Sequence, residues 1–307
     1  MGQIFFIVMR TPPSIKPGDK IGIAATARKI TSQEIEYAVK VIEDRGLVLV
    51  LADNLFLSDH QYAGSDSQRA AGFQKLLDDP EIMAVLSVRG GYGSVRVVDK
   101  IDFSKFKENP KWLAGYSDFT VFLNHVPENY GVETLHATMP VNFRENTEDA
   151  LNGLFEVLSG KRPEYRWVSG KLYKKGTAGG ALIGGNLSVL YSMLGSSSFP
   201  ETEGNVLFLE DLDEYLYHID RMMQALKRAG KLEGLSGLVI GAMTDMNDNT
   251  VAFGKTAGEI IFESVEEYGY PVVMNFSAGH INNNLPLIIG GKTVLEVSDD
   301  QAVLKFG

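Results

Sequence analysis

The sequence predicts an α/β protein built from two domains. Apolar runs of strand length alternate with amphipathic segments of helix length, a pattern typical of parallel βαβ units. The chain has 307 residues, of which 44% are hydrophobic, so it contains ample material for a core. We expect an N-terminal α/β domain over 1–150, an interdomain connection over 151–174 and a smaller C-terminal mixed β/α domain over 175–307.

The first half opens on strand-like segments that are followed by turn or helix signals. Capping-box spacing at Thr31–Glu34 and Ser65–Gln68 predicts the starts of two helices. Apolar residues at helical spacing predict further helices through 95–98 and from Phe119. The expected strands are 20–25, 47–51, 82–88 and 112–115.

The stretch after about residue 145 changes character. It is polar, then basic and weakly periodic, which favours a connection with one short helix near 151–158. In the second half, helices are expected over 187–194, 215–226 and 256–268, with the acidic run 211–214 opening the second of them. The expected strands there are 206–209, 235–243, 271–275, 287–289, 293–297 and 302–305.

Composition excludes several classes of partner and site. The net charge of −10 argues against nucleic acid and against an anionic membrane surface. Because the chain has no cysteine, disulfides, thiolate nucleophiles and cysteine–zinc sites are excluded, and a reducing cytoplasm is compatible with the sequence. No apolar run reaches the length of a transmembrane helix.

The first eight residues contain a short apolar patch. It has neither a basic region before it nor a small-residue cleavage site after it, so it is not identified as a signal peptide. We expect Met9 to be the natural start and residues 1–8 to be an upstream extension.

Ser117 stands at the most informative point of the sequence. The apolar run Trp112–Gly115 leads through Tyr116 into this serine, and an apolar-periodic segment follows from Phe119. A strand, a sharp turn and a helix in this order resemble a nucleophile elbow, although Thr120 stands where the usual pattern has a second glycine. The alternative is that Ser117 only caps the helix.

A glycine-rich loop, Arg89–Gly93, follows the preceding strand. In parallel sheets ligands bind beyond the carboxyl ends of the strands, which places this loop and Ser117 at one edge. The loop could bind phosphate through backbone amides, although it matches no phosphate-binding pattern, or it could supply an oxyanion-hole donor. The Gly179–Asn186 segment invites the same phosphate interpretation on equally weak spacing.

A serine nucleophile needs a base, and the chain has five histidines. His280 lies in a glycine-flanked loop after an expected strand, where catalytic bases are often found. His60 and His218 are interpreted as solvated and structural, His125 lies too far along the helix that follows Ser117, and His136 stays open.

Glu210 is the candidate acid that would orient the base. It continues the apolar strand 206–209, so its carboxylate would be held at a strand end. The chain order Ser–Glu–His is that of α/β-hydrolase triads, although here the acid and the base come from the second half.

Taken together, the motifs resemble those of the LD-carboxypeptidases, serine peptidases of the muramoyl-tetrapeptide carboxypeptidase type. The segments that carry the resemblance are TPPSIKPGDKIGIAATA, SVRGGYGS, GYSDFT, LIGGNLSVL, FLEDLDEYLYHIDRM and AGHINNN, which span nearly the whole chain. Where many members carry phenylalanine before the Gly-His pair, this sequence has Ala278, which leaves the base in place but changes the local pocket.

The resemblance implies a site and a reaction. Its triad positions correspond to Ser117, Glu210 and His280, and its oxyanion-hole donors to the backbone N–H groups of Asp118 and Gly91. The reaction would release a terminal D-alanine from a murein tetrapeptide. The residues expected to bind that substrate are Arg89, Gly90, Tyr92 and Asn186, although Arg89 could equally form a structural ion pair.

The resemblance also implies a flavodoxin-like or glutamine-amidotransferase-like N-terminal domain, a cytoplasmic homodimer, and no metal or cofactor. Two alternatives stay open. Microcin C self-immunity proteins resemble this chain but cleave acyl-adenylate conjugates, and they would need an aromatic platform such as Trp167. A non-catalytic module that binds a small anionic ligand through the glycine-rich loops is the second alternative.

Overall fold

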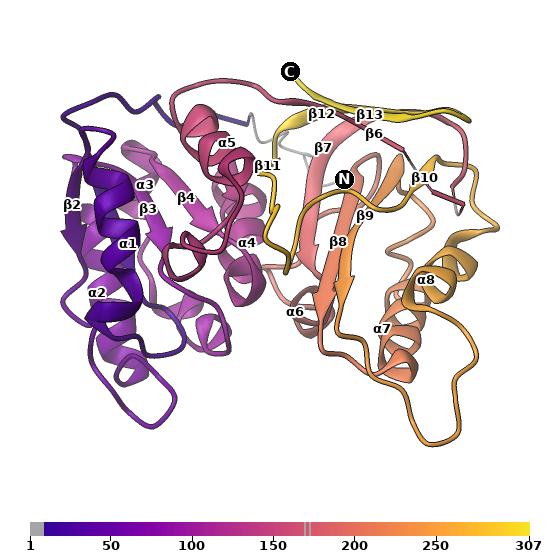
Figure 1. The fold of residues 1–307 in the computed structure, drawn as a ribbon, viewed down its shortest axis with the longest axis horizontal. Helices are drawn as coiled ribbons and strands as arrows, with labels where there is room; N and C mark the ends of the chain where they lie inside the picture. Colours follow the sequence, from indigo (N-terminus) through magenta and orange to yellow (C-terminus); the bar gives the residue numbers. More distant parts are fainter. Residues whose placement is uncertain (1–8, 169, 172) are drawn as a thin grey trace, which may run out of the picture.

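A computed structural model describes residues 9–168, 170–171 and 173–307, and the expected extension at 1–8 lies outside the described residues. The described chain forms two sheets that lie side by side with helices packed against them (Figure 1). This is the mixed α/β architecture that the sequence predicts, with a parallel sheet in the N-terminal domain and a mixed sheet in the second domain.

The N-terminal sheet has strand order β11-β5-β4-β3-β1-β2. Its first five strands along the chain pair in parallel, and their order β2-β1-β3-β4-β5 is the flavodoxin-like order. β11 joins from the far end of the chain and pairs antiparallel with β5. The bounds are β1 Lys20–Ala24, β2 Val48–Leu51, β3 Ile82–Ser87, β4 Trp112–Gly115, β5 Thr134–His136 and β11 Leu287–Ile289.

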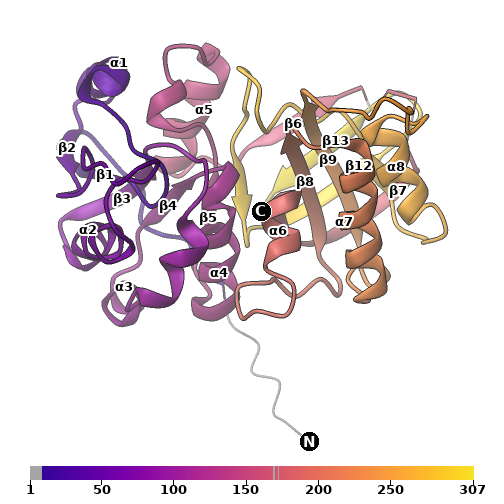
Figure 2. The ribbon, with the colours of Figure 1, turned by 90° about the horizontal axis from the view of Figure 1, so that it is seen from below.

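Helices cover both faces of this sheet. α1 (Ser32–Glu43) and α5 (Glu148–Leu158) lie on one face, and α2 (Asp66–Asp78), α3 (Ser104–Glu108) and α4 (Thr120–Tyr130) lie on the other (Figure 2). The capping boxes predicted for α1 and α2 are both present, at N-cap residues Thr31 and Ser65. Buried aliphatic and aromatic side chains fill the space between the helices and the sheet.

The second sheet has strand order β10-β9-β8-β7-β12-β13-β6, with β7 to β10 parallel and the other three antiparallel. α7 (Leu216–Arg228) packs between α6 (Leu187–Ser192) and α8 (Ala257–Val265). The strand bounds are β6 Glu164–Trp167, β7 Gly176–Asn186, β8 Val206–Leu212, β9 Gly237–Thr244, β10 Val272–Val273, β12 Lys292–Val297 and β13 Ala302–Phe306.

Two local predictions were wrong. The helix expected over 95–98 is replaced by two 3₁₀ turns, Ser94–Arg96 and Val98–Lys100, because Gly93 (φ 147°) turns the chain sharply just before them. The acidic run after Glu210 does not open a helix either. Asp211 and Leu212 continue strand β8, and α7 begins only at Leu216.

The two sheets are joined by polar contacts between α4 and β7. The Asn124 side chain donates to Gly184 O (3.0 Å) and accepts from Gly184 N (2.9 Å). Thr120 Oγ1 accepts from Asn186 N at 3.1 Å. These bonds dock the helix that follows Ser117 directly onto the strand beside β8, and so they fix the distance between the two halves of the site.

Candidate active site

Ser117 occupies a strained turn between β4 and α4. Its φ is +61°, a left-handed conformation that is uncommon for a residue other than glycine. Such backbone conformations concentrate at functional sites, because the surrounding structure must hold them in place. A 3₁₀ turn, Ser117–Phe119, then leads into α4, so this is the strand–turn–helix geometry of a nucleophile elbow. Its side chain does not act as an N-cap hydrogen-bond acceptor, because α4 follows Phe119 and carries no side-chain cap.

The glycine-rich loop lies against this serine. A Cβ atom at Gly90 would stand 2.7 Å from Ser117 Oγ and 3.5 Å from Asp118 N, so only glycine allows the loop to approach so closely. At Gly91 (φ +108°), a Cβ would meet the aliphatic stem of Arg28 at 2.1 Å. The loop, the serine and the backbone N–H of Asp118 therefore border one small space.

His280 and Glu210 form a hydrogen-bonded pair. The distance from His280 Nδ1 to Glu210 Oε2 is 2.7 Å, and the carboxylate is fully buried while the imidazole is 14% exposed. Because Nδ1 donates to the carboxylate, the other nitrogen, Nε2, is left as an acceptor. The Tyr116 ring packs against the imidazole in a T-shaped arrangement, with 4.8 Å between the ring centroids, and restricts its rotation.

Two features of the second sheet hold Glu210 in place. Glu210 pairs with Asn186 of β7, and the register between β8 and β9 shifts by one residue between Leu209 and Asp211. Such irregularities commonly lie next to active sites, where they redirect a side chain. The loop that carries His280 is tied to the first domain, because Asn282 O accepts from Thr147 N at 3.0 Å.

Ser117 and His280 line one cleft of about 380 Å³, and no hydrogen bond joins them within the described residues. Catalytic hydrogen bonds are often long in unliganded enzymes and tighten when substrate binds. The cleft lies between the two domains. Its lining residues include Arg28, Arg89, Gly90, Gly91, Asp118, Asn142, Asn186, Ser188, Asp211 and Asp213.

The expected substrate-binding residues have different surroundings. Gly90 and Asn186 line the cleft, but the Asn186 side chain also caps α6 and donates to Asp211 Oδ1 at 2.9 Å. Arg89 lines the cleft and also forms the ion pair considered as its alternative, with Glu34 at 3.3 Å. Tyr92 does not line it. Its half-exposed ring lies 6.3 Å from Tyr62, because the glycines on either side turn this part of the loop outward.

Sequence patterns did not single out Arg28, Asp211 or Asp213 as cleft residues. Arg28 is exposed and, among the described residues, forms no ion pair. It follows the carboxyl end of β1 by four residues, so the rule that ligands bind at this edge could have found it. Asp213 has φ +59°, a conformation that the sequence alone does not reveal.

His280 and Glu210 each stabilise the ionised form of the other. Burial opposes ionisation, but the charge and hydrogen bond of Glu210 outweigh it and raise the pKa of His280 above its ordinary 6.5. For Glu210 burial is likewise opposed and outweighed by His280, so the pKa of the carboxyl is lowered. Burial, with the nearby Glu210 charge, raises the pKa of Asp211 to about 7. The cleft thus contains two groups, His280 and Asp211, whose pKa values are raised.

Three other histidines have surroundings that are accounted for by solvation or by structural contacts, without a catalytic role. His60 is exposed beside Asp59. His125 is buried and bonds Ser198 Oγ at 2.9 Å. His218 pairs with a glutamate of its own helix region and does not line the cleft.

His136, which the sequence left open, is fully buried behind the site. Its ring packs 5.8 Å from Tyr116 and 5.1 Å from Phe208, and neither ring nitrogen has a hydrogen-bond partner among the described residues. Burial lowers its pKa to about 4, so the imidazole is neutral at physiological pH. It has no access to the cleft.

The described residues carry few features of other kinds of site. They contain no group of three or more His, Asp or Glu side chains placed to hold a metal ion. No helix among them is long and apolar enough to cross a membrane. A larger hollow of about 480 Å³ lies beside β9 and α8, but neither Ser117 nor His280 lines it.

Comparisons with known proteins match both halves of the chain. The family model of the LD-carboxypeptidase N-terminal domain matches residues 21–137, and that of the LD-carboxypeptidase C-terminal domain matches residues 179–295. A probable murein peptide carboxypeptidase of Bacillus subtilis is 31% identical, over 96% of this chain and 94% of the relative.

Two further relatives extend this likeness. The crystal structure of a muramoyltetrapeptide carboxypeptidase from Oxalobacter formigenes superposes with a TM-score of 0.86 at 26% identity, covering 94% of this chain and 98% of that one. The microcin C7 self-immunity protein MccF of Escherichia coli is 25% identical, over 91% of both chains.

Proposed function

This chain belongs to the LD-carboxypeptidase family, and we propose that it is a serine peptidase that releases the terminal D-alanine from murein tetrapeptide. The observation that carries this proposal is the convergence of three elements on one cleft: the strained Ser117 turn, the glycine-rich loop, and the buried pair of His280 and Glu210. The murein substrate rests on what the relatives are named for.

The residues have distinct roles in the proposed reaction. His280 removes the Ser117 proton as Oγ attacks the carbonyl of the third residue of the peptide, and Glu210 holds the imidazole tautomer and stabilises the imidazolium. His280 then protonates the departing amine of D-alanine, and water hydrolyses the acyl-enzyme. The backbone N–H groups of Asp118 and Gly91, or of the adjacent Gly90, would stabilise the tetrahedral oxyanion, each donor contributing about 3 kcal/mol.

An assay with two substrates tests this function. We expect the protein to release D-alanine from a murein tetrapeptide and to leave an acyl-sulfamoyl adenylate intact. The opposite preference would favour the microcin C self-immunity activity. Saturable peptide binding without turnover, unchanged in Ser117→Ala, would favour a non-catalytic binding module.

The surroundings of Trp167 support a tetrapeptide substrate over an acyl-adenylate substrate. An adenine platform needs an accessible aromatic face at the cleft, but the Trp167 ring packs 5.0 Å from Phe276, and its Nε1 donates to Met274 O at 2.9 Å. It is not among the residues that line the cleft.

Arg28 is the cation that we expect to bind the terminal carboxylate. Among the described residues it has no acidic partner, whereas Arg89 is already paired with Glu34. Because a charge-assisted hydrogen bond contributes about 1.5–3 kcal/mol, Arg28→Gln should raise KM for the tetrapeptide about 10- to 100-fold. The measurement is KM in Arg28→Gln, with Arg89→Gln as the matched control, which should change KM less.

A peptide that ends in D-alanine amide makes this prediction specific. It should bind the wild type weakly and lose little more in Arg28→Gln, since the carboxylate partner is already missing. An equal loss for the acid and the amide would show that Arg28 acts on something other than the carboxylate.

The pH dependence follows from His280. A general base must be neutral, so kcat/KM should rise with pH through the pKa of His280, which Glu210 holds above 6.5. Removing the Asp211 charge by Asp211→Asn takes away a second influence that raises this pKa, so the midpoint should move to lower pH. Initial rates measured across the range where imidazoles titrate would check both statements. An activity that does not change over this range would contradict the assignment of the base.

We also propose a cytoplasmic homodimer, as the family resemblance implies. A mass measured in solution by light scattering, together with fractionation of the host cell, would test both parts.

A further inference from the structure

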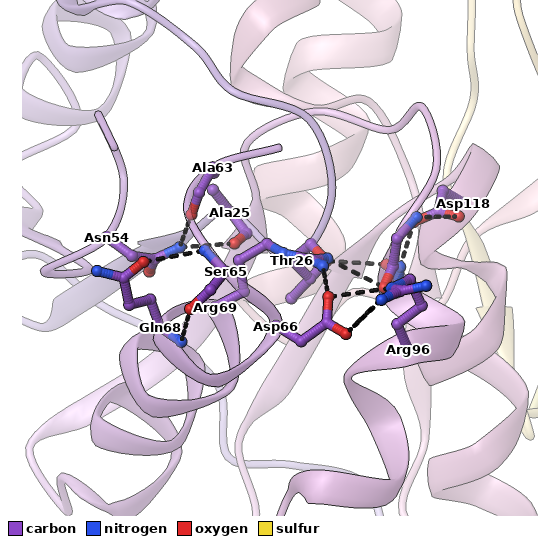
Figure 3. Close-up of polar contacts among 12 residues, drawn as sticks. Ala25, Thr26, Asn54, Ala63, Ser65, Asp66, Gln68, Arg69, Arg96 and Asp118 are labelled. Carbon is purple, nitrogen blue, oxygen red and sulfur yellow. Dashed lines mark hydrogen bonds and ion pairs between the residues drawn. The ribbon is translucent and has the colours of Figure 1, made fainter. Parts of the chain in front are cut away.

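We propose that Asp118 and Arg69 form a clamp that holds the two halves of the oxyanion hole at a fixed spacing. The clamp joins α2, the turn after β1, the glycine-rich loop and the Ser117 turn (Figure 3). The inference rests on the proposed function, because the oxyanion hole affects the reaction only if Ser117 is acylated. Asp118 and Arg69 are positioning residues in this scheme, and their side chains do not touch the substrate.

The Asp118 side chain connects the two segments that supply the oxyanion donors. Its carboxylate accepts from Ser94 N at 2.8 Å through Oδ2 and from Gly93 N at 3.3 Å through Oδ1. Its own backbone N–H is one of the expected donors of the hole. One residue thus supplies a donor and also anchors the loop that supplies the other donor.

Arg69 holds the same loop from the opposite side. Its side chain is fully buried in the domain, and Nη1 donates to Thr26 O and, at 3.1 Å, to Gly93 O. Nη2 pairs with Asp66, which begins α2 and also pairs with Arg96 at 2.8 Å. Gly93 is therefore held at both of its flanking peptide groups, by Asp118 at its N–H and by Arg69 at its C=O.

The loop needs such an anchor because its own backbone offers little stiffness. Gly91 and Gly93 both have positive φ, at 108° and 147°, and glycine adopts many alternative conformations at no steric cost. Asp118 is 3% exposed and Arg69 is fully buried, so water cannot replace the hydrogen bonds of the clamp. Electrostatic stabilisation of a transition state depends on donors that are already in position before the reaction.

Asp118→Asn tests the clamp. An amide keeps the shape but presents an NH₂ group to one of the two backbone donors, so the loop loses an anchor. We expect kcat to fall about 100-fold, as for the loss of one oxyanion-hole donor, with KM changed little. Ground-state binding is measured with the tetrapeptide: Ser117→Ala and the double variant Ser117→Ala, Asp118→Asn should bind it with the same affinity. Binding of the tetrahedral adduct is measured with a peptide aldehyde, which mimics that adduct. Asp118→Asn alone should bind the aldehyde more weakly than the wild type does, by the same factor by which kcat falls.

A second variant and a matched control keep the test decisive if Asp118→Asn does not fold. Arg69→Lys keeps the positive charge but cannot reach both carbonyl groups. We therefore expect kcat to fall by less than in Asp118→Asn, again with KM changed little. Arg96→Gln removes a half-exposed side chain that pairs with Asp66 and keeps the Arg96 backbone N–H that donates to Gly93 O at 3.0 Å, so it should leave kcat unchanged.

Phosphonylation of Ser117 by a fluorophosphonate separates this inference from the proposed function. The reaction uses the oxyanion hole but no peptide, so its rate should fall with kcat in Asp118→Asn even if the natural substrate is not murein. A folded Asp118→Asn or Arg69→Lys protein with wild-type phosphonylation and wild-type aldehyde affinity would overturn the clamp. A wild type that is phosphonylated but releases no D-alanine would overturn only the murein substrate.

Discussion

Replacing Ser117 with alanine is expected to lower kcat for D-alanine release by about 10⁴- to 10⁶-fold, the loss seen when a triad nucleophile is removed. The remaining hole and cleft should still bind the peptide, so the affinity measured by calorimetry should change little. The fold should be retained, because the substitution removes one hydroxyl from a residue whose φ of +61° is imposed by its neighbours.

Ser188→Ala provides the matched control. Ser188 lines the same cleft and loses the same hydroxyl, but it lies at the start of α6 and far from the Ser117 turn in sequence. Its loss of activity should be far smaller. If Ser117→Ala and Ser188→Ala retained similar activity, Ser117 could not be the nucleophile.

The second large effect is expected for Glu210→Gln. A buried amide of nearly the same shape can donate to His280 Nδ1, which puts the imidazole proton on Nε2, where the base needs a free lone pair. A substitution of this kind in a serine peptidase triad lowers kcat by about 10⁴-fold. The variant should also shift the alkaline-favoured pH profile to lower pH, because Glu210 is what raises the pKa of His280.

A second glutamate–histidine pair in the same chain serves as the control. Glu214 Oε2 lies 2.5 Å from His218 Nδ1, the same pair of atoms in the same kind of contact, but neither residue lines the cleft. Glu214→Gln should therefore leave kcat and the pH profile unchanged. Wild-type activity in Glu210→Gln would remove Glu210 from the mechanism, and equal losses in the two variants would point to stability as the cause.

The part of the site that could be predicted from the sequence lies at the ends of strands. Ser117, Glu210 and the glycine-rich loop each follow or end an apolar strand run, and parallel strands bring their carboxyl ends to one edge. The expectation that Ser117 and the glycine-rich loop lie around one space therefore needed no knowledge of packing, whereas Glu210 belongs to the second sheet and is brought to them by the contacts between α4 and β7. The capping boxes of α1 and α2 were predictable for a similar reason, since they depend on contacts within four residues.

Other features depend on contacts that are distant in the sequence. β11 is three residues long and has no periodicity that assigns it to the N-terminal sheet, which it joins from residue 287 onward. β6 lies within the stretch expected to be a connection, and only its pairing with β13 makes it a strand. Arg69 falls on an amphipathic helix, where an arginine ordinarily lies at the surface, yet it is fully buried.

The assignment of Ser117 as the nucleophile is tested most directly by mapping a fluorophosphonate label. The wild-type protein would be treated until inhibited, digested and analysed by mass spectrometry, with D-alanine release followed in parallel. We predict one phosphonyl group on Ser117, slower labelling in the presence of tetrapeptide, and activity that falls in proportion to the labelled fraction. Full D-alanine release from protein whose Ser117 is completely labelled, or complete inhibition with the label on another residue, would contradict the assignment.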